Sequence, residues 1–250
     1  MYFDTSKYLE YLDPNTFGSN LLYLEETTST NDEVWKHIKD NNHIVVIAER
    51  QKEGRGRRDN TWHSFEEKSL TFSIGIKLDK SIANHIAFII PLSICNTIKK
   101  KFHINVGVKW PNDIIVNNKK IAGVLIESKL KKSIQIYNIG IGINVNLNKD
   151  DLKSLDIKDI TSILFETNSI ADREKFLSDI LISIDEYLLK SKDEIIKLWL
   201  ENCVHLNMKV QFHKNDQIIC GIFKSIDDNG NAMIGVGNKI KSFSSGVIEL

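Results

Sequence analysis

Short apolar runs and helical spacings of apolar residues alternate along this chain, and one stretch is the most informative. The runs Ile114–Val116 and Ile121–Ile126 flank the polar segment Asn117–Lys120. Asn-Asn within that segment tolerates positive φ and suits a tight turn. The stretch therefore predicts a β-hairpin, with Gly123 inside its second strand. A glycine within a strand indicates a bulge or a close approach of another group to the backbone.

Polar residues lead into this hairpin as Lys109-Trp-Pro-Asn-Asp113, and Lys120 opens its second strand. Pro111 fixes its own φ and favours an extended Trp110, so the segment is stiff. A cation, a carboxylate and a bare backbone patch on one rigid hairpin are typical of a small-molecule site. A solvated hairpin with Trp110 in the core explains the same spacing equally well.

Further elements follow from the same patterns. Strands are predicted at Leu21–Leu24, Ile44–Ala48, Leu70–Ile76 and Ile134–Val145, and Val106–Val108 leads into the hairpin. Helices are predicted at Thr5–Leu12, 30–40, Ser81–Phe102, Asp172–Lys190 and Lys192–Cys203, and a loop at Asn148–Asp159. Thr30 and Glu33 have the spacing of a capping box at the start of the second of these helices. Glycine and isoleucine alternate from Gly140 onwards, which permits close packing or the approach of a ligand.

The pattern changes near residue 206 to short β-runs joined by turns. Strands are predicted at Lys209–Phe212, Ile218–Ser225, Ala232–Val236 and Ile240–Phe243, with a hairpin turn at Asp227–Gly230. We therefore divide the chain into a main domain, 1–205, and a small all-β module, 206–250. A module of this size is expected to pack on the main domain for stability.

Composition excludes several classes of protein. The chain has 250 residues, 42% of them hydrophobic and 26% charged, which is ordinary for a globular protein. Lys plus Arg and Asp plus Glu balance at 33 each, which argues against binding to nucleic acid or to an anionic membrane through a global basic field. No apolar run reaches the ~18 residues of a spanning helix, and no signal peptide is visible, so we expect a cytoplasmic protein.

The cysteines and histidines suggest no metal site. Cys95, Cys203 and Cys220 lack C-x-x-C spacing, and buried reduced thiols are the expected state. The seven histidines lack the spacing of a zinc-binding motif, so no metal ligand is predicted.

An Arg/Gly loop lies between two predicted strands, within residues 49–64. Gly54-Arg-Gly-Arg-Arg58 combines three guanidinium groups with two glycines, which let backbone N–H groups approach an anion. The loop is neither a Walker A motif nor a dinucleotide fingerprint, because Gly-Lys-Ser/Thr is absent and a strand follows. Trp62 can stack on an aromatic base. A flexible basic loop with affinity for nucleic acid is the alternative.

Several motifs occur together in a fixed order. They are Thr28-Ser-Thr-Asn31, Gln51, Gly54-Arg-Gly-Arg-Arg58, Trp62, Lys109-Trp-Pro-Asn-Asp113, Lys120-Ile-Ala-Gly123 and Gly142-Ile-Asn-Val-Asn146. The series resembles the biotin–protein ligases, from about Leu21 to the end of the sequence. The resemblance implies an α+β fold, with a mixed sheet and flanking helices as in class II aminoacyl-tRNA synthetases, followed by a small C-terminal SH3-like β-barrel.

The resemblance also implies an activity. Such a ligase uses ATP to activate biotin as biotinyl-5′-AMP and transfers it to a lysine of the biotin carboxyl-carrier protein or domain of a carboxylase. ATP, biotin and Mg²⁺ are the implied small molecules. The cationic side chains suit this chemistry, because adenylation brings two anions together.

Family roles transfer onto matching positions. The implied biotin-binding residues are Ser29, Thr30, Asn31, Gln51, Arg55, Gly56, Arg57, Lys120 and Gly123. The implied nucleotide-binding residues are Trp62, Asn144, Arg55 and Arg57, and the implied catalytic residues are Lys120, Arg57 and Asp113. The Arg/Gly loop would close over biotin and its adenylate as a lid.

One position departs from the family pattern: Asp59-Asn60 stands where Gly-Arg usually continues the loop. A cation is lost and an anion gained near the phosphates, so we expect weaker lid ordering or weaker ATP binding. A lipoate or octanoate ligase, and a non-catalytic biotin- or nucleic-acid-binding protein, remain the competing interpretations.

Regulation and assembly are further expectations. Only about 20 residues precede the first matching strand, too few for the helix-turn-helix domain that some family members carry. We therefore expect a short form without specific DNA binding. A homodimer is possible, because some family members dimerise through the catalytic-domain sheet.

Overall fold

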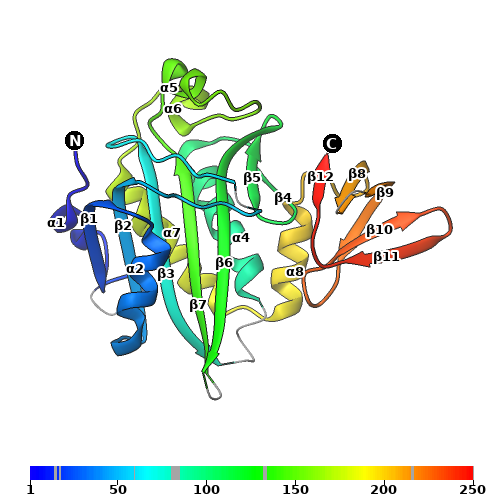
Figure 1. Cartoon of the computed structure of the whole chain (residues 1–250), viewed down its shortest axis with the longest axis horizontal. Coiled ribbons are helices and arrows are strands. Elements are labelled where there is room, and N and C mark those ends of the chain that lie inside the picture. The colour runs from blue at the N-terminus through cyan, green and yellow to red at the C-terminus, as the bar shows by residue number, and fades with distance from the viewer. Residues whose placement is uncertain are drawn as a thin grey trace.

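The computed structural model describes residues 1–13, 16, 18–58, 60–79, 85–131, 134–214 and 217–249. Its main sheet has seven strands in the order β1-β2-β3-β7-β6-β5-β4 (Figure 1). They are β1 (Leu21–Thr27), β2 (His43–Gln51), β3 (Ser69–Asp79), β4 (Gly107–Lys109), β5 (Asp113–Val116), β6 (Lys119–Lys131) and β7 (Ile134–Asn144). β1 and β2 pair in parallel and the other neighbours pair antiparallel, so the sheet is mixed.

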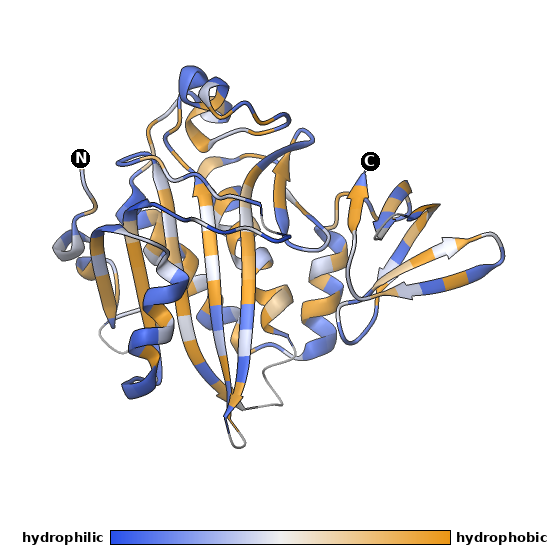
Figure 2. Ribbon diagram, viewed as in Figure 1, coloured by the Kyte–Doolittle hydropathy of each residue, from blue (hydrophilic) through white to orange (hydrophobic). Residues whose placement is uncertain are grey.

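Helices cover both faces of this sheet. They are α1 (Thr5–Glu10), α2 (Thr30–His37), α4 (Ile86–Phe102), α5 (Lys149–Ser154), α6 (Ile163–Thr167), α7 (Arg173–Leu188) and α8 (Lys192–Glu201). The larger core lies between the sheet and the face covered by α4 and α7. A small separate cluster lies under α2, where Val34 and Ile38 meet Ile44 and Val46 of β2. Figure 2 shows that hydrophobic residues dominate the central strands.

A second sheet of five antiparallel strands follows α8, at the right of Figure 1. Its order is β11-β10-β9-β8-β12, formed by β8 (Lys209–Lys214), β9 (Gln217–Ile226), β10 (Ala232–Val236), β11 (Lys239–Phe243) and β12 (Val247–Glu249). Phe212 of β8 packs on Phe243 of β11 with ring centroids 4.5 Å apart, so the sheet curls on itself. These two sheets with their helices confirm the predicted α+β fold class. The boundary between 205 and 206 stays a prediction.

The hairpin predicted first is confirmed as β5–β6. Asn117 and Asn118 form its turn with φ of 49° and 64°, the left-handed values that asparagine tolerates. Trp110, which leads into this hairpin, is 3% exposed and lies in the core. Its indole Nε1 donates to the carbonyl of Gly230, 2.9 Å away, and its ring packs on Phe212. Trp110 therefore joins the main sheet to the C-terminal module.

Three local predictions need correction or fall partly outside the described residues. The capping box is wrong: Ser29 is the N-cap of α2, while Thr30 is already helical and directs its hydroxyl to Gln51. The loop at Asn148–Asp159 is wrong in its first half, because Asn148 and Asp151 form a capping box that starts α5. α4 is described from Ile86 onwards, and residues 81–84 of the longer predicted helix lie outside the described residues.

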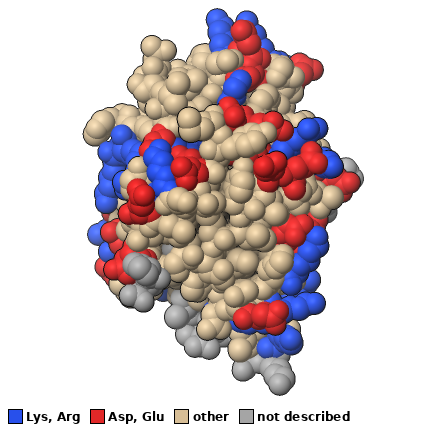
Figure 3. Space-filling view, turned by 90° about the vertical axis from the view of Figure 1, so that its left-hand side faces the viewer, with Lys and Arg blue, Asp and Glu red and all other residues tan. Residues whose placement is uncertain are grey.

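The cysteine prediction holds for two of the three thiols. Cys95 and Cys203 are buried and free, whereas Cys220 on β9 is free and exposed. None of the described helices is long and apolar enough to cross a membrane. On the face drawn in Figure 3, basic and acidic side chains are interspersed, in keeping with the balanced composition.

Candidate functional site

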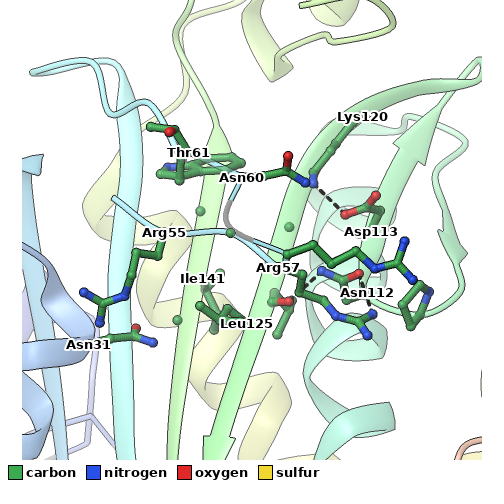
Figure 4. A pocket seen from close by; sticks show the side chains of 18 of the residues that line it. Asn31, Arg55, Arg57, Asn60, Thr61, Asn112, Asp113, Lys120, Leu125 and Ile141 are labelled. Atoms are coloured by element: carbon green, nitrogen blue, oxygen red, sulfur yellow. Dashed lines mark hydrogen bonds and ion pairs between the residues drawn. The ribbon is translucent and has the colours of Figure 1, made fainter. Parts of the chain in front are cut away.

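A cavity of ≈ 240 Å³ opens where α2, the Arg/Gly loop, the β5–β6 hairpin and β7 meet (Figure 4). The structure brings to it eleven of the predicted site residues: Ser29, Thr30, Asn31, Gln51, Arg55, Gly56, Arg57, Trp62, Asp113, Lys120 and Gly123. They come from segments that lie far apart in the sequence, from Ser29 to Gly123. Their convergence on one cavity is the main structural support for a single small-molecule site.

One end of the cavity is polar and is built by the start of α2. The backbone N–H of Thr30 donates to Oε1 of Gln51 over 2.7 Å, and the Thr30 hydroxyl lies 3.0 Å from the same oxygen. Ser29, Thr30 and Asn31 are 2%, 2% and 4% exposed. Buried polar groups at a helix start are suited to holding a compact polar ligand.

The other end of the cavity carries an ion pair on the hairpin. Lys120 Nζ lies 2.6 Å from Oδ1 of Asp113, as Figure 4 shows. Gly123 explains how the lysine fits: a Cβ at this position would lie 3.0 Å from both Cε and Nζ of Lys120. The close approach predicted at Gly123 is therefore, in this structure, the approach of the Lys120 ammonium group.

Arg57 reaches the same end from the loop. Its Nη1 donates to Oδ1 of Asn112 over 3.2 Å, and Nδ2 of Asn112 donates to the carbonyl of Val124 over 2.8 Å. Burial, reinforced by the charge of Arg58, lowers the pKa of Arg57. Together, Arg57 and Lys120 supply cationic side chains where anionic groups would meet.

Arg55 fastens the loop to α2. Its guanidinium group donates to both carboxylate oxygens of Asp32, at 3.0 and 2.7 Å. This hydrogen bonding to Arg55, together with its positive charge, lowers the pKa of Asp32. Asp32 was missed in the sequence, because only the fold brings it next to the loop. The Arg55–Asp32 pair is a latch between the loop and the polar end of the cavity.

Trp62 covers the glycine side of β7. A Cβ on Gly142 would lie 2.1 Å from Cε2 of the indole, so only glycine lets the ring lie on this strand. Gly140 plays the same part for Asn31, whose Oδ1 would be 2.5 Å from a Cβ there. The alternation of glycine and isoleucine in β7 thus makes room for two site residues on one face.

Asn144 is the one predicted site residue that the structure does not bring to the cavity. It is 5% exposed, and its Nδ2 donates to the carbonyl of Thr161 over 3.0 Å. That bond ties the end of β7 to the segment before α6. Its predicted contact with the nucleotide stays a prediction.

The C-terminal module also contributes to the cavity, through Gly246, Val247 and Ile248. No sequence pattern indicated this contact, because it joins segments more than a hundred residues apart. Trp110 holds the module in place from the other side, through Gly230 and Phe212.

Metal binding by the protein alone finds no support in the described part of the chain, where no three His, Cys, Asp or Glu side chains form a cluster. Asp113 is the single acidic residue among the described residues that line the cavity, and it is paired with Lys120.

Comparison with known proteins places these features in a family. Residues 22–145 match the model of the Biotin/lipoate A/B protein ligase family. The "Bifunctional ligase/repressor BirA" of Bacillus spizizenii is 27% identical over 249 residues, covering 96% of this chain and 76% of that protein. The "Biotin--[acetyl-CoA-carboxylase] ligase" of Mycobacterium tuberculosis is 24% identical and covers 81% and 77%.

A solved structure supports the same assignment. The biotin protein ligase of Aquifex aeolicus, solved in complex with biotin and ATP, superimposes with a TM-score of 0.75 and 29% identity. The match covers 92% of this chain and 97% of that structure. The chain belongs to the biotin protein ligase family.

Proposed function

We propose that this protein is an ATP-dependent biotin–protein ligase. It activates biotin as biotinyl-5′-AMP and transfers the biotinyl group to a lysine of a carrier domain of a carboxylase. The observation that carries the proposal is the convergence of a polar end, built by α2 and Gln51, and a cationic end, built by Arg57 and Lys120, on one cavity.

In the first step, a biotin carboxylate oxygen attacks the α-phosphorus of ATP, and pyrophosphate leaves. Ser29, Thr30, Asn31 and Gln51 would hold the ureido ring, which directs the carboxylate towards the hairpin. Lys120 and Arg57 would offset the repulsion between the carboxylate and the phosphates, and their charges also stabilise the transition state. Trp62 would stack on the adenine ring.

Mg²⁺ bound together with ATP would supply positive charge that offsets the charge of the phosphates. Asp113 is the carboxylate of the cavity that could help to hold such an ion, and it is paired with Lys120 at 2.6 Å.

In the second step, the amine of the carrier lysine attacks the biotinyl carbonyl, the C–N bond forms, and AMP leaves with the electrons of the C–O bond. The amine must arrive without its extra proton. Asp113, oriented by Lys120, would accept a hydrogen bond from that amine, and the proton that the nitrogen loses as the amide forms would leave with the phosphate of AMP. The loop from Arg55 to Arg58, latched by Asp32, would keep water from the adenylate meanwhile.

Biotin-dependent exchange of labelled pyrophosphate into ATP tests the first step, with lipoate run in parallel. Exchange with biotin alone is the expected result. Exchange with lipoate alone would reassign the protein to lipoate ligation, which the matched family also includes. No exchange with either acid would overturn the adenylation proposal.

Transfer to an isolated biotin carrier domain tests the second step. Biotinylation that is lost when the acceptor lysine of the carrier is replaced by arginine is the expected result. Exchange without any transfer would restrict the proposal to adenylation.

A further inference from the structure

A chain of hydrogen-bonding groups runs behind the polar end of the cavity, from Gln51 through Thr30 and Ser73 to Asn31. The Thr30 hydroxyl lies 3.0 Å from Oε1 of Gln51 and 2.6 Å from Oγ of Ser73. Ser73 Oγ lies 2.6 Å from the side-chain amide of Asn31. Ser73 is on β3, is 0% exposed and does not line the cavity, so it acts only through its neighbours.

The direction of this chain is fixed at Gln51. The backbone N–H of Thr30 can only donate, and it points at Gln51 over 2.7 Å, so the facing atom must be the oxygen. That oxygen can only accept, which makes the Thr30 hydroxyl the donor in their 3.0 Å contact. With its single proton committed, Thr30 can only accept from Ser73.

The same count then decides the last contact. Ser73 also has one proton, and it is committed to Thr30, so the group that Asn31 turns towards Ser73 must be a donor. The NH₂ end of the amide meets this requirement and the oxygen does not. The two ends of an amide have nearly the same shape, so the hydrogen bonds decide which faces which way.

The structure draws Asn31 in the opposite orientation, with Oδ1 accepting from Ser73 Oγ over 2.6 Å, and this orientation leaves two faults. With Oδ1 towards Ser73, three contacts share two hydroxyl protons, and Nδ2 is buried with no partner among the described residues. An NH₂ group buried without an acceptor is costly. Turning the amide by half a turn removes both faults and leaves the oxygen at the unpartnered position, which Figure 4 draws directed across the cavity towards Ile141 and Leu125.

The rest of Asn31 is held firmly, so the amide can only choose between these two orientations. Its backbone carbonyl accepts from Nδ2 of Asn138 over 2.8 Å, and the same Nδ2 also donates to Glu127. The amide lies against β7, where Gly140 leaves no Cβ to displace it.

We propose that Ser73 is a positioning residue that fixes the polarity of the Gln51–Thr30–Ser73–Asn31 chain, so that Asn31 offers an oxygen, not an NH₂ group, to the ligand. The inference rests on the proposed function, under which this oxygen accepts from a ureido N–H of biotin. It assigns Ser73 a part in selecting cyclic ureas over ligands that offer only acceptors at this position.

Replacing Ser73 by alanine removes the proton that sets this direction. We expect Ser73→Ala to raise KM for biotin in pyrophosphate exchange roughly 5- to 100-fold, the range for a buried hydrogen bond left unmade. KM for ATP should stay within about twofold of the wild-type value, because this chain of hydrogen bonds lies only at the polar end of the cavity. Ser73→Thr keeps the hydroxyl and should restore most of the affinity for biotin.

Ser93→Ala is the matched control. Ser93 is also 0% exposed, lies on α4 outside the cavity, and its Oγ has no partner among the described residues. It should leave both KM values unchanged. A purely structural role for Ser73 would instead lower the melting temperature, raise both KM values together, and overturn the inference.

A biotin analogue with one ureido N–H replaced by oxygen gives a second measurement, by calorimetric titration. We expect the wild type to lose roughly 5- to 100-fold in affinity for one of the two such analogues, and Ser73→Ala to lose much less, since its amide can turn. Equal losses in both proteins would overturn the inference. A wild type that binds no biotin and exchanges no pyrophosphate would overturn the proposed function, and the inference with it.

Discussion

At the scale of single residues, Lys120 and Asp113 form the pair whose value is functional rather than structural. Their side chains are 35% and 29% exposed, and ion pairs open to water contribute little to stability. Gly123 keeps room for the ammonium group at a position where any other residue would crowd it. Gly123 was predicted as a place of close approach because it lies inside a strand, and the role of Lys120 was predicted from the resemblance to biotin–protein ligases.

Lys120→Gln should therefore reduce activity far more than stability. We expect biotin-dependent exchange to fall by roughly 100-fold or more, the usual cost of removing one group that stabilises developing charge. The melting temperature should change little. Lys119→Gln is the control, because Lys119 lies over the ring of Phe165 and outside the cavity. Equal losses in the two variants would show that charge on the hairpin, not its position, matters.

Asn60 is the residue at which this loop departs from its family. It lines the cavity, and its carbonyl accepts from the N–H of Gly56 over 2.6 Å. Asp59 lies outside the described residues. Because a guanidinium group at position 60 would add a phosphate contact, Asn60→Arg should tighten ATP binding by roughly 5- to 10-fold, the value of one charge-assisted hydrogen bond. Titration with ATP of the wild type and of Asn60→Arg measures the two affinities, and equal affinities would contradict the prediction.

Residues beyond the motifs were harder to predict. Asp32 reaches the site through its contact with Arg55, which is 23 residues away in the sequence. Ser73 reaches it through its contact with Thr30, which is 43 residues away. A serine within an apolar strand run carries no signal of its own. The direction of its hydrogen bonds exists only once α2 lies on β3.

At the scale of elements, β7 shows how a strand can carry both core and site. Its isoleucines Ile139, Ile141 and Ile143 are at most 2% exposed and pack into the core, while Gly140 and Gly142 face the cavity side. Period-two alternation sends neighbours to opposite faces of a sheet. The sequence therefore predicted a close approach on the glycine face, but not that Asn31 and Trp62 make it.

Gly142→Ala should displace Trp62. The new Cβ would lie 2.1 Å from the indole, which no rotation of a methyl group can relieve. We expect a shift in tryptophan fluorescence and an ATP affinity weaker by roughly 10-fold, the loss of one aromatic stacking contact. Gly235→Ala is the control, since the nearest atoms to its Cβ would lie 3.5 Å away, at an ordinary contact distance. An unchanged fluorescence spectrum in Gly142→Ala would contradict the position of the Trp62 indole on β7.

Short helices were the elements that sequence patterns handled worst. α5 and α6 are six and five residues long, too short to show a helical period. α5 nevertheless had a signal, since Asn148 and Asp151 have capping-box spacing. At α2 the same spacing misled, because Thr30 has a stronger partner in Gln51.

At the scale of the whole molecule, the C-terminal module is part of one continuous core with the main domain. Two backbone hydrogen bonds join the segment between them to β4. The N–H of Val108 donates to the carbonyl of Asn202 over 2.8 Å, and the N–H of Val204 donates to the carbonyl of Val108 over 3.1 Å. The module was predictable from its β-runs and turns. The contact of the module with Trp110 and its contribution to the cavity lining could not be predicted, because both depend on packing between distant segments.

His205 lies at this junction and makes it sensitive to acid. The residue is 0% exposed, its ring is 4.3 Å from that of Phe223, and Cys203 Sγ lies 3.6 Å away. Burial, and to a lesser degree the charge of Lys109, lower the pKa of His205 from 6.5 to about 3. The unfolded chain therefore binds a proton below pH 6.5 that the folded protein refuses until about pH 3.

The free energy of unfolding should consequently fall as pH is lowered from 6.5 towards 5, with a slope approaching about 1.4 kcal/mol per pH unit from this one group. His205→Phe keeps an aromatic ring beside Phe223 and should flatten that slope. Urea unfolding at several pH values measures it, and His63→Phe, at an exposed position, is the control. If the slope persists in His205→Phe, the acid sensitivity arises elsewhere. If it disappears, the burial of one uncharged imidazole ring accounts for the loss of stability in acid.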